Sequence, residues 1–201
     1  DYTPEANHYG IDIHGEIGDP VSAADNGVVV YAGWNDWGYG EMIVIVHGQG
    51  WQTLYAHLST VDVSCGQEVY QGDIIGTVGT TGNSSGPHLH FEVRLGENSY
   101  YKTDNPALWL SQRVTQDGKT LGSLAGLVIR QSGVVEIAKS ITLEALDKNG
   151  EVNGEKYFFR TYEDPQLYVN ALLQENFVHA DLPAGDYRLT VVAGKLFERI
   201  V

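Results

Sequence analysis

Short apolar runs of strand length, separated by glycine-rich turns, dominate the first half of the chain. The runs are rich in β-branched and aromatic residues and comprise VVVYAG (28–33), EMIVIVHG (41–48), TLYAHLS (53–59) and DIIGTVG (73–79). Such runs, bounded by glycine clusters, are typical of β-strands. No stretch before Asn105 keeps a 3.6-residue period, and NPALWLSQR (105–113) predicts only one short helical turn. We therefore predict an all-β first half that ends near residue 113.

A second group of apolar runs follows the polar stretch VTQDGKTLG (114–122). About seven short strands, with KNG and PAGD as turns, fit into the remaining residues, which predicts a small β-sandwich. The stretch NFVHADLPAGDYRLTV resembles the closing hairpin of prealbumin-like and Cna-B-like modules. We expect a first domain over residues 1–113, a linker over 114–122 and a β-sandwich accessory domain over 123–201.

The segment NSSGPHLHFEV (83–93) places two histidines at the start of a predicted strand. Alternation puts three apolar side chains on one face and four polar ones on the other: Leu89, Phe91 and Val93, then His88, His90, Glu92 and Arg94. The two imidazoles of this HLH pair start about 6.6 Å apart, so both can reach one small object. An isolated pair of this kind is ordinarily part of a solvated face. A metal site is indicated only if other ligand-type residues occur elsewhere in the chain.

Such residues occur in NHYGIDIHG (7–15). A straight strand would hold His8 and Asp12 about 13 Å apart, too far for one metal. A bend at Gly10 that leads into a strand near Ile11 would instead bring His8 over Asp12. Zinc takes imidazole nitrogen and carboxylate oxygen, and a catalytic site keeps three protein ligands and one open position. His8, Asp12 and one histidine of the HLH pair fit that description, and the residues alone do not say which one.

Other histidines carry weaker signals. Alternation in TLYAHLS predicts two strand faces, one with Thr53, Tyr55 and His57 and one with Leu54, Ala56 and Leu58. From this strand alone, a satisfied polar histidine is the preferred interpretation of His57 over a catalytic one. We expect a structural hydrogen bond for His47, a neighbouring position for His14 and no catalytic part for His179.

Composition is that of an ordinary soluble globular protein, with 42% hydrophobic and 19% charged residues. No apolar run approaches the roughly 20 residues of a membrane span, and no targeting segment opens the chain. The net charge of −14 argues against a nucleic-acid partner. Residues 1–113 hold 3 basic and 14 acidic side chains and residues 114–201 hold 9 and 12, which supports a boundary between them. Cys65, the single cysteine, excludes an internal disulfide, and we expect it to be packed.

Four segments in order carry a resemblance to a known family: HYGID, PVSAADNGVVVYAG, HGQGWQTLYAHLS and GQEVYQGDIIGTVGTTGNSSGPHLHFEV. Together they resemble the lysostaphin-type (LytM-like) zinc endopeptidases over residues 7–110. The resemblance implies one zinc ion per chain held by His8, Asp12 and His90, and two catalytic histidines that do not bind it, His57 and His88. The implied activity is zinc-dependent hydrolysis of peptide bonds in peptidoglycan stem peptides or cross-bridges. The implied location is outside the cytoplasm: secreted, periplasmic or associated with the cell wall.

Two other functions remain open. One is a non-catalytic regulator of cell-wall hydrolases on the same fold. Regulators that resemble this family commonly lack some ligands, whereas His8, Asp12 and His90 are all present here. The other is a cupin-type metal enzyme, which Gly82 ahead of the HLH pair partly fits. A cupin, however, requires a glutamate three or four residues after the second histidine, and it would leave HYGID unused.

Several features keep more than one interpretation. Glu92 could orient a metal ligand or be a plain surface carboxylate. Trp34, Trp37 and Tyr39 could line a substrate wall or cap the sheet. The second domain could bind wall polymer, bind protein or act as a spacer. Family members normally have another strand before HxxxD, whereas seven residues precede His8 here, so one edge of the groove is left unpredicted. The negative charge predicts that any wall attachment depends on the second domain or on sequence outside this chain.

Overall fold

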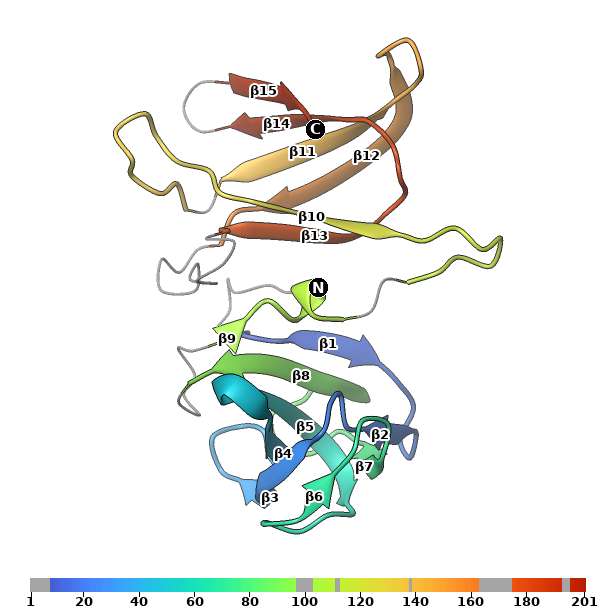
Figure 1. Cartoon of the computed structure of the whole chain (residues 1–201), viewed down its shortest axis with the longest axis vertical. Coiled ribbons are helices and arrows are strands. Elements are labelled where there is room, and N and C mark those ends of the chain that lie inside the picture. Colours follow the sequence, from blue (N-terminus) through green and yellow to red (C-terminus); the bar gives the residue numbers. More distant parts are fainter. Residues whose placement is uncertain (1–7, 97–102, 111–112, 138, 163–174, 193–195) are drawn as a thin grey trace. The chain divides into compact units, whose positions relative to one another are not determined.

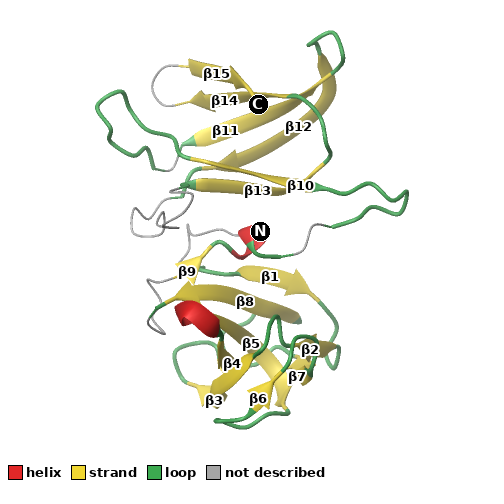
Figure 2. Ribbon diagram, viewed as in Figure 1, coloured by secondary structure: helices red, strands yellow, loops and turns green. Residues whose placement is uncertain are grey.

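The structure is a computed structural model that describes residues 8–96, 103–110, 113–137, 139–162, 175–192 and 196–201. Strands predominate, and the helical segments in these ranges are single 3-10 turns, η2 (Gly48–Gly50) and η3 (Pro106–Leu108) (Figures 1 and 2). The turn η3 lies where the sequence predicts one. The predicted all-β class is confirmed. The chain divides into two compact units, residues 1–106 and 107–201.

One antiparallel sheet of nine strands forms the first unit. The strands are β1 (Ile11–His14), β2 (Pro20–Ser22), β3 (Gly27–Asn35), β4 (Gly40–Val46), β5 (Trp51–Val61), β6 (Glu68–Val69), β7 (Ile74–Val78), β8 (His88–Leu95) and β9 (Thr103–Asp104). The main path runs β1-β8-β5-β4-β3-β6, while β7 pairs with β5 and β2, and β9 pairs with β8. Strand β8 therefore lies between β1 and β5 (Figure 1), which brings the three histidine-bearing segments together.

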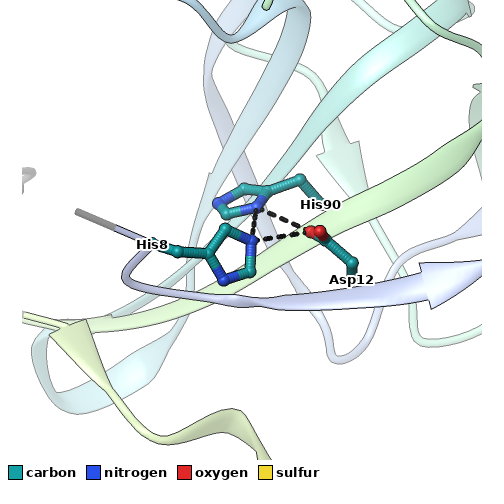
Figure 3. A group of neighbouring side chains, drawn as sticks. All are labelled: His8, Asp12 and His90. Atoms are coloured by element: carbon teal, nitrogen blue, oxygen red, sulfur yellow. Dashed lines mark hydrogen bonds and ion pairs between the residues drawn. The ribbon is translucent and has the colours of Figure 1, made fainter. Parts of the chain in front are cut away.

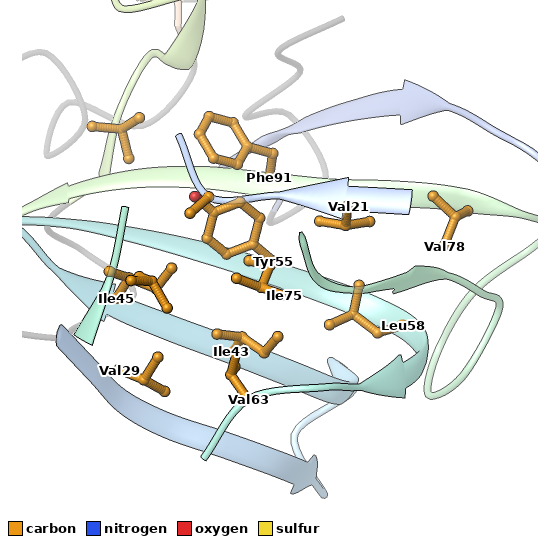
Figure 4. Packing of buried hydrophobic residues seen from close by; sticks show 13 residues of the cluster. Val21, Val29, Ile43, Ile45, Tyr55, Leu58, Val63, Ile75, Val78 and Phe91 are labelled. Atoms are coloured by element: carbon orange, nitrogen blue, oxygen red, sulfur yellow. The ribbon is translucent and has the colours of Figure 1, made fainter. Parts of the chain in front are cut away.

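Both faces of this sheet are packed near its centre. The larger core contains Ile43, Ile45, Tyr55 and Phe91 among others (Figure 4). A smaller cluster on the opposite face consists of Met42, Val44, Leu54 and Ala56. Strand β4 contributes alternate side chains to both clusters, which accounts for its unbroken apolar run. The HLH pair projects on the face of the smaller cluster, because Phe91 of the same strand belongs to the larger core.

The described residues of the second unit form two antiparallel sheets. The strands are β10 (Gly122–Gly126), β11 (Ser140–Leu146), β12 (Val152–Arg160), β13 (Phe177–Leu182), β14 (Tyr187–Val192) and β15 (Leu196–Ile200). Strands β10 and β13 pair with each other, and the others follow the order β12-β11-β14-β15. Ile141 and Leu143 of β11 pack with Phe177 and Leu182 of β13, so the two sheets share a core. The resemblance to prealbumin-like modules, like the boundaries drawn around residues 114–122, stays a prediction.

Two smaller expectations have opposite outcomes. His47 makes the expected structural contacts, with Nδ1 2.8 Å from the carbonyl oxygen of Asn26 and Nε2 2.8 Å from Oγ1 of Thr53. The expectation that Cys65 is packed is wrong, because the residue is exposed. A turn of the chain leaves its thiol at the surface, where it donates to the carbonyl of Val30.

In the ranges that the structure describes, no helix is long and apolar enough to span a membrane.

Candidate metal centre

Two elements far apart in sequence bring His8, Asp12 and His90 together. In the antiparallel pairing of β1 with β8, Asp12 lies directly opposite His90. The chain bends at Gly10, as the sequence predicts, and thereby returns His8 towards Asp12. A side chain at residue 10 could not be accommodated, because a Cβ atom there would lie 2.5 Å from the carbonyl oxygen of Phe91 and 2.9 Å from the His90 ring. The glycine thus permits the close approach of this bend to β8.

The donor atoms of the three side chains converge on one point (Figure 3). Nε2 of His8 lies 2.8 Å from Oδ1 of Asp12. Nδ1 of His90 lies 3.1 Å from each of these two atoms. Three ligands bound at about 2.1 Å in tetrahedral geometry would be separated by about 3.4 Å. The donor set and its spacing therefore fit a zinc ion with little movement, and two imidazoles with one carboxylate leave a fourth position open.

Charge in this group is strongly coupled. Burial works against the charged form of Asp12, but the bonds from His8 and His90 outweigh it and hold the pKa of the carboxyl far below its usual range. Burial also works against the imidazolium form of His90. Here the bonds to Asp12 and Glu92 outweigh burial and raise the pKa of His90 to about 9. Without metal, His90 is therefore in its protonated, imidazolium form at neutral pH.

Glu92 lies under His90 and is fully buried, so its interpretation as a plain surface carboxylate is wrong. Its Oε1 accepts from Nε2–H of His90 at 2.9 Å, and its Oε2 accepts from Nε–H of Arg94 at 2.6 Å. Burial would raise the pKa of Glu92, but the bond from His90 and the charge of Arg94 outweigh it and lower the pKa. No role for Arg94 was predicted from the sequence. Its position two residues after Glu92, on the same strand face, could have predicted that the two side chains pair.

His57 reaches this face through a break in strand alternation. Strand β5 holds one extra residue opposite β4, because Tyr55 pairs with Ile43 and Leu58 pairs with Glu41. His57 lies at this bulge with φ of 60°, a left-handed conformation that non-glycine residues rarely adopt. Tyr55 and Leu58 consequently share the larger core, while the His57 ring lies beside His88 and His90. The expectation that Tyr55 and His57 share a face is wrong for this reason.

The rings of His57 and His88 are held in the same way. Nδ1–H of His57 donates to the carbonyl of Thr81 at 2.8 Å, and Nδ1–H of His88 donates to the carbonyl of Gly86 at 2.8 Å. These bonds leave Nε2 of each ring as the acceptor. Nε2 of His88 lies 3.5 Å from Oδ1 of Asp12, and the two rings are 4.8 Å apart between centroids. Burial lowers the pKa of His57 more than its bond to Thr81 raises it, which favours the neutral base.

The other aromatic and histidine residues considered from the sequence differ in their distance from the centre and in their exposure. The hydroxyl of Tyr39 donates to Glu92 at 2.6 Å beneath the centre, and the Tyr39 ring lies 5.7 Å from the ring of His90. Trp34, near the end of β3, is 53% exposed, and Trp37, in the turn that follows, is 92% exposed. His14 is exposed and pairs in register with His88. His179 lies in the second unit, where its ring stacks on Phe159 at 4.7 Å.

Known proteins share the part of the chain that holds this centre. The sequence model described as peptidase family M23 matches residues 6–102. The glycyl-glycine endopeptidase ALE-1 of Staphylococcus capitis is 45% identical over 105 residues, which are 52% of this chain and 29% of that protein. The murein hydrolase activator NlpD of Salmonella dublin is 43% identical over 109 residues, 54% of this chain and 28% of that protein.

A solved structure extends the comparison to the fold. The catalytic domain of the antimicrobial peptidase lysostaphin from Staphylococcus simulans is 39% identical, with a TM-score of 0.50. The match covers 51% of this chain and 77% of that domain. By contrast, the chain spans less than a third of the length of the curated relatives it matches. The similarity is therefore to one domain of longer proteins, and those relatives include both a peptidase and an activator.

Proposed function

This chain belongs to peptidase family M23, and on that premise we propose that it is a zinc-dependent endopeptidase that hydrolyses peptide bonds of peptidoglycan. The observation that carries the proposal is the convergence of Nε2 of His8, Oδ1 of Asp12 and Nδ1 of His90 to within about 3 Å of one another. Two further imidazoles present acceptor nitrogens beside this group. Such a set supports hydrolysis more than binding alone.

Which nitrogen of each ring is bonded to a neighbour supports the proposed division of roles. His8, Asp12 and His90 would hold one zinc ion per chain. When bound, zinc supplies a Lewis acid that polarises the scissile carbonyl and lowers the pKa of water towards about 7. The single carboxylate among the three residues leaves this part of the site with net positive charge once the ion is present. That charge suits the oxyanion that forms when water adds to an amide carbonyl.

His57 and His88 would move protons. Their Nδ1–H groups are occupied by the carbonyls of Thr81 and Gly86, so each Nε2 can accept a proton and each ring can then donate it. One ring would take the proton of the attacking water on Nε2; once protonated, it would stabilise the developing oxyanion by a hydrogen bond and then return that same proton to the leaving amine. The bulge that places His57 beside His88 is therefore central to the proposal.

The relatives support a proposed substrate and location. The similarity to a glycyl-glycine endopeptidase supports cross-bridge or stem peptides of peptidoglycan as the substrate. Because peptidoglycan lies outside the cytoplasm, we propose an extracytoplasmic location for the protein. We further propose that residues 1–113 are the catalytic domain, that 114–122 are a linker, and that 123–201 form an accessory domain that binds wall polymer or protein.

The decisive experiment is digestion of several peptidoglycan types and of pentaglycine by the zinc-loaded protein, with mass spectrometry of the products. New amino termini should appear with wild type and not with zinc-free protein. Purified protein that holds stoichiometric zinc and yet releases no amine from any of these substrates would overturn the proposal.

A second function has one observation in its favour, which is the similarity to the activator NlpD over a comparable length. On this alternative the chain would bind and activate a separate wall hydrolase without cleaving peptide itself. The test is to add the zinc-loaded protein to a purified murein hydrolase and to measure soluble muropeptides. Stimulation of that hydrolase, together with no peptide-bond cleavage by this chain, would replace the first proposal with the second.

A further inference from the structure

A buried polar network lies directly beneath the proposed metal ligand His90. Its centre is Glu92, which has no exposed surface, and Arg94 beside it is only 4% exposed. Both residues project from β8 on the same face as His90, because side chains two positions apart on a strand share a face. Burying two charges in a sheet of this size is costly unless each is paired and bonded. The network therefore calls for a physical reason.

Every oxygen of Glu92 is engaged. Oε1 accepts from Nε2–H of His90 at 2.9 Å and from the hydroxyl of Tyr39 at 2.6 Å. Oε2 accepts from Nε–H of Arg94 at 2.6 Å, and Nη2 of Arg94 also donates to the Tyr39 hydroxyl at 3.0 Å. Three side chains thus hold the carboxylate, and its direct bond to a proposed metal ligand is the one from the His90 ring.

The orientation of that ring decides which nitrogen faces the other ligands. With Nε2–H donated to Glu92, Nδ1 is the nitrogen that lies 3.1 Å from His8 and from Asp12. A ring turned by half would offer a different nitrogen at a different place. The Cγ methylene of Glu92 also lies against the bend that carries His8, since a Cβ atom at Gly10 would be 2.9 Å from it.

We infer that Glu92 is a positioning residue for the metal centre, holding His90 so that Nδ1 faces His8 and Asp12, with Arg94 and Tyr39 fixing the carboxylate. This inference rests on the metal centre proposed above and adds three residues to it. None of the three touches the reacting atoms. Their contribution is to fix the tautomer and the angle of one ligand, which in metal sites generally affects affinity by about 10- to 100-fold.

The competing explanation is that the network only stabilises the sheet. The two explanations differ in what they predict for zinc affinity at equal folding. Glu92→Gln keeps the size of the side chain but removes the carboxylate. Thr53→Val is the matched control, because Thr53 is also buried on the neighbouring strand β5 and its hydroxyl contacts His47 and Tyr55 rather than the centre.

The experiment measures zinc affinity of the full chain by competition with a chelator, and stability by urea unfolding of the zinc-free protein. We expect Glu92→Gln to weaken zinc binding by about 10- to 100-fold. Thr53→Val should lower stability and leave zinc affinity within about twofold of wild type. Glu92→Gln that folds and binds zinc as tightly as wild type would overturn the inference.

A spectroscopic arm tests orientation directly. In protein loaded with cadmium-113, the metal should couple to Nδ1 of His90 in wild type, and this coupling should be lost or moved to Nε2 in Glu92→Gln. Tyr39→Phe removes one hydrogen-bond donor to Glu92 without leaving a buried charge unpaired. This variant therefore tests whether the network sets zinc affinity if Glu92→Gln does not fold. It should weaken zinc binding by about tenfold, and an unchanged affinity would overturn the inference. Failure of wild type to bind zinc at all would instead overturn the proposed function.

Discussion

His90 lies beside the rings of His57 and His88 but differs from them in the hydrogen-bond partner of its second ring nitrogen. His90 donates one ring N–H to a buried carboxylate, and its other nitrogen, Nδ1, faces His8 and Asp12. His57 and His88 are backed by main-chain carbonyls, and their Nε2 atoms remain as acceptors. A carboxylate raises the basicity of a ring and suits it to hold a cation, whereas a neutral carbonyl fixes the tautomer without adding charge. On the proposed roles, the group bonded to the second nitrogen of the ring distinguishes His90, which would hold the metal, from His57 and His88, which would transfer protons.

The largest expected difference between His90 and the pair His57 and His88 is in zinc binding, and removing one ring at a time tests it. His90→Ala should abolish stoichiometric zinc binding and reduce peptide hydrolysis to background, because two ligands remain and Glu92 is left buried without its partner. His88→Ala, two residues away on the same face, should keep one zinc per chain. Equilibrium dialysis with metal analysis measures both. Retention of stoichiometric zinc by His90→Ala would contradict the assignment of ligands.

The next effect concerns the carbonyl-backed pair alone. His57→Gln and His88→Gln should each lower the turnover number by about 10²- to 10⁴-fold, the usual contribution of a general acid or base. Zinc content should be unchanged in both. Peptide hydrolysis rates at saturating substrate, normalised to bound zinc, give the measurement. Equal loss of zinc and activity would show that these rings act as ligands and would remove the distinction.

A pH titration sharpens the difference in charge between the groups. The pKa of His90 is raised to about 9, so below that pH zinc must displace a proton from the ring. Binding of zinc therefore releases this proton, and the affinity should rise with pH by about tenfold per unit between pH 7 and 9. Chelator competition at several pH values measures the slope. The slope should be the same in His57→Gln, and a flat profile in wild type would contradict the coupling of His90 to its two carboxylates.

The smallest expected effect comes from removing the second unit. Both histidine groups lie within residues 1–106, which form a compact unit with their own core. A chain ending at residue 113 should keep zinc affinity and hydrolysis of a soluble peptide within about twofold. Binding to whole cell walls is the contrasting readout, and its loss on deletion would assign attachment to residues 114–201. A large fall in soluble-peptide hydrolysis would show instead that the second unit supports the centre.

Much of the fold and part of the centre could be predicted from local pattern. Runs of β-branched residues between glycine turns indicated the strands β3, β4, β5 and β7 within a few residues of their observed ends. The bend at Gly10 followed from the need to bring His8 over Asp12. These features depend on neighbours in sequence, so periodicity and turn chemistry suffice to predict them.

Other features depended on contacts that the sequence does not display. Strict alternation assigned His57 to the face of Tyr55, whereas the bulge in β5 turned it towards the HLH pair. Glu92 looked equally suited to the surface, because nothing in HLHFEV shows that Tyr39, 53 residues away, lies over it. From the sequence, the choice between His88 and His90 as ligand rested on resemblance alone; the pairing of β1 with β8, which brings Asp12 opposite His90, supports the proposed choice of His90.

The amino-acid sequence by itself determined which side chains are available, their parity on each strand and the turns between strands. Only the tertiary structure decided which nitrogen of each imidazole faces the centre. That choice depends on the partner of the opposite nitrogen: Glu92 for His90, Thr81 for His57 and Gly86 for His88. The physical reason is that an imidazole has two nearly equivalent nitrogens, so its role is set by hydrogen bonds from neighbours that the folded backbone brings near.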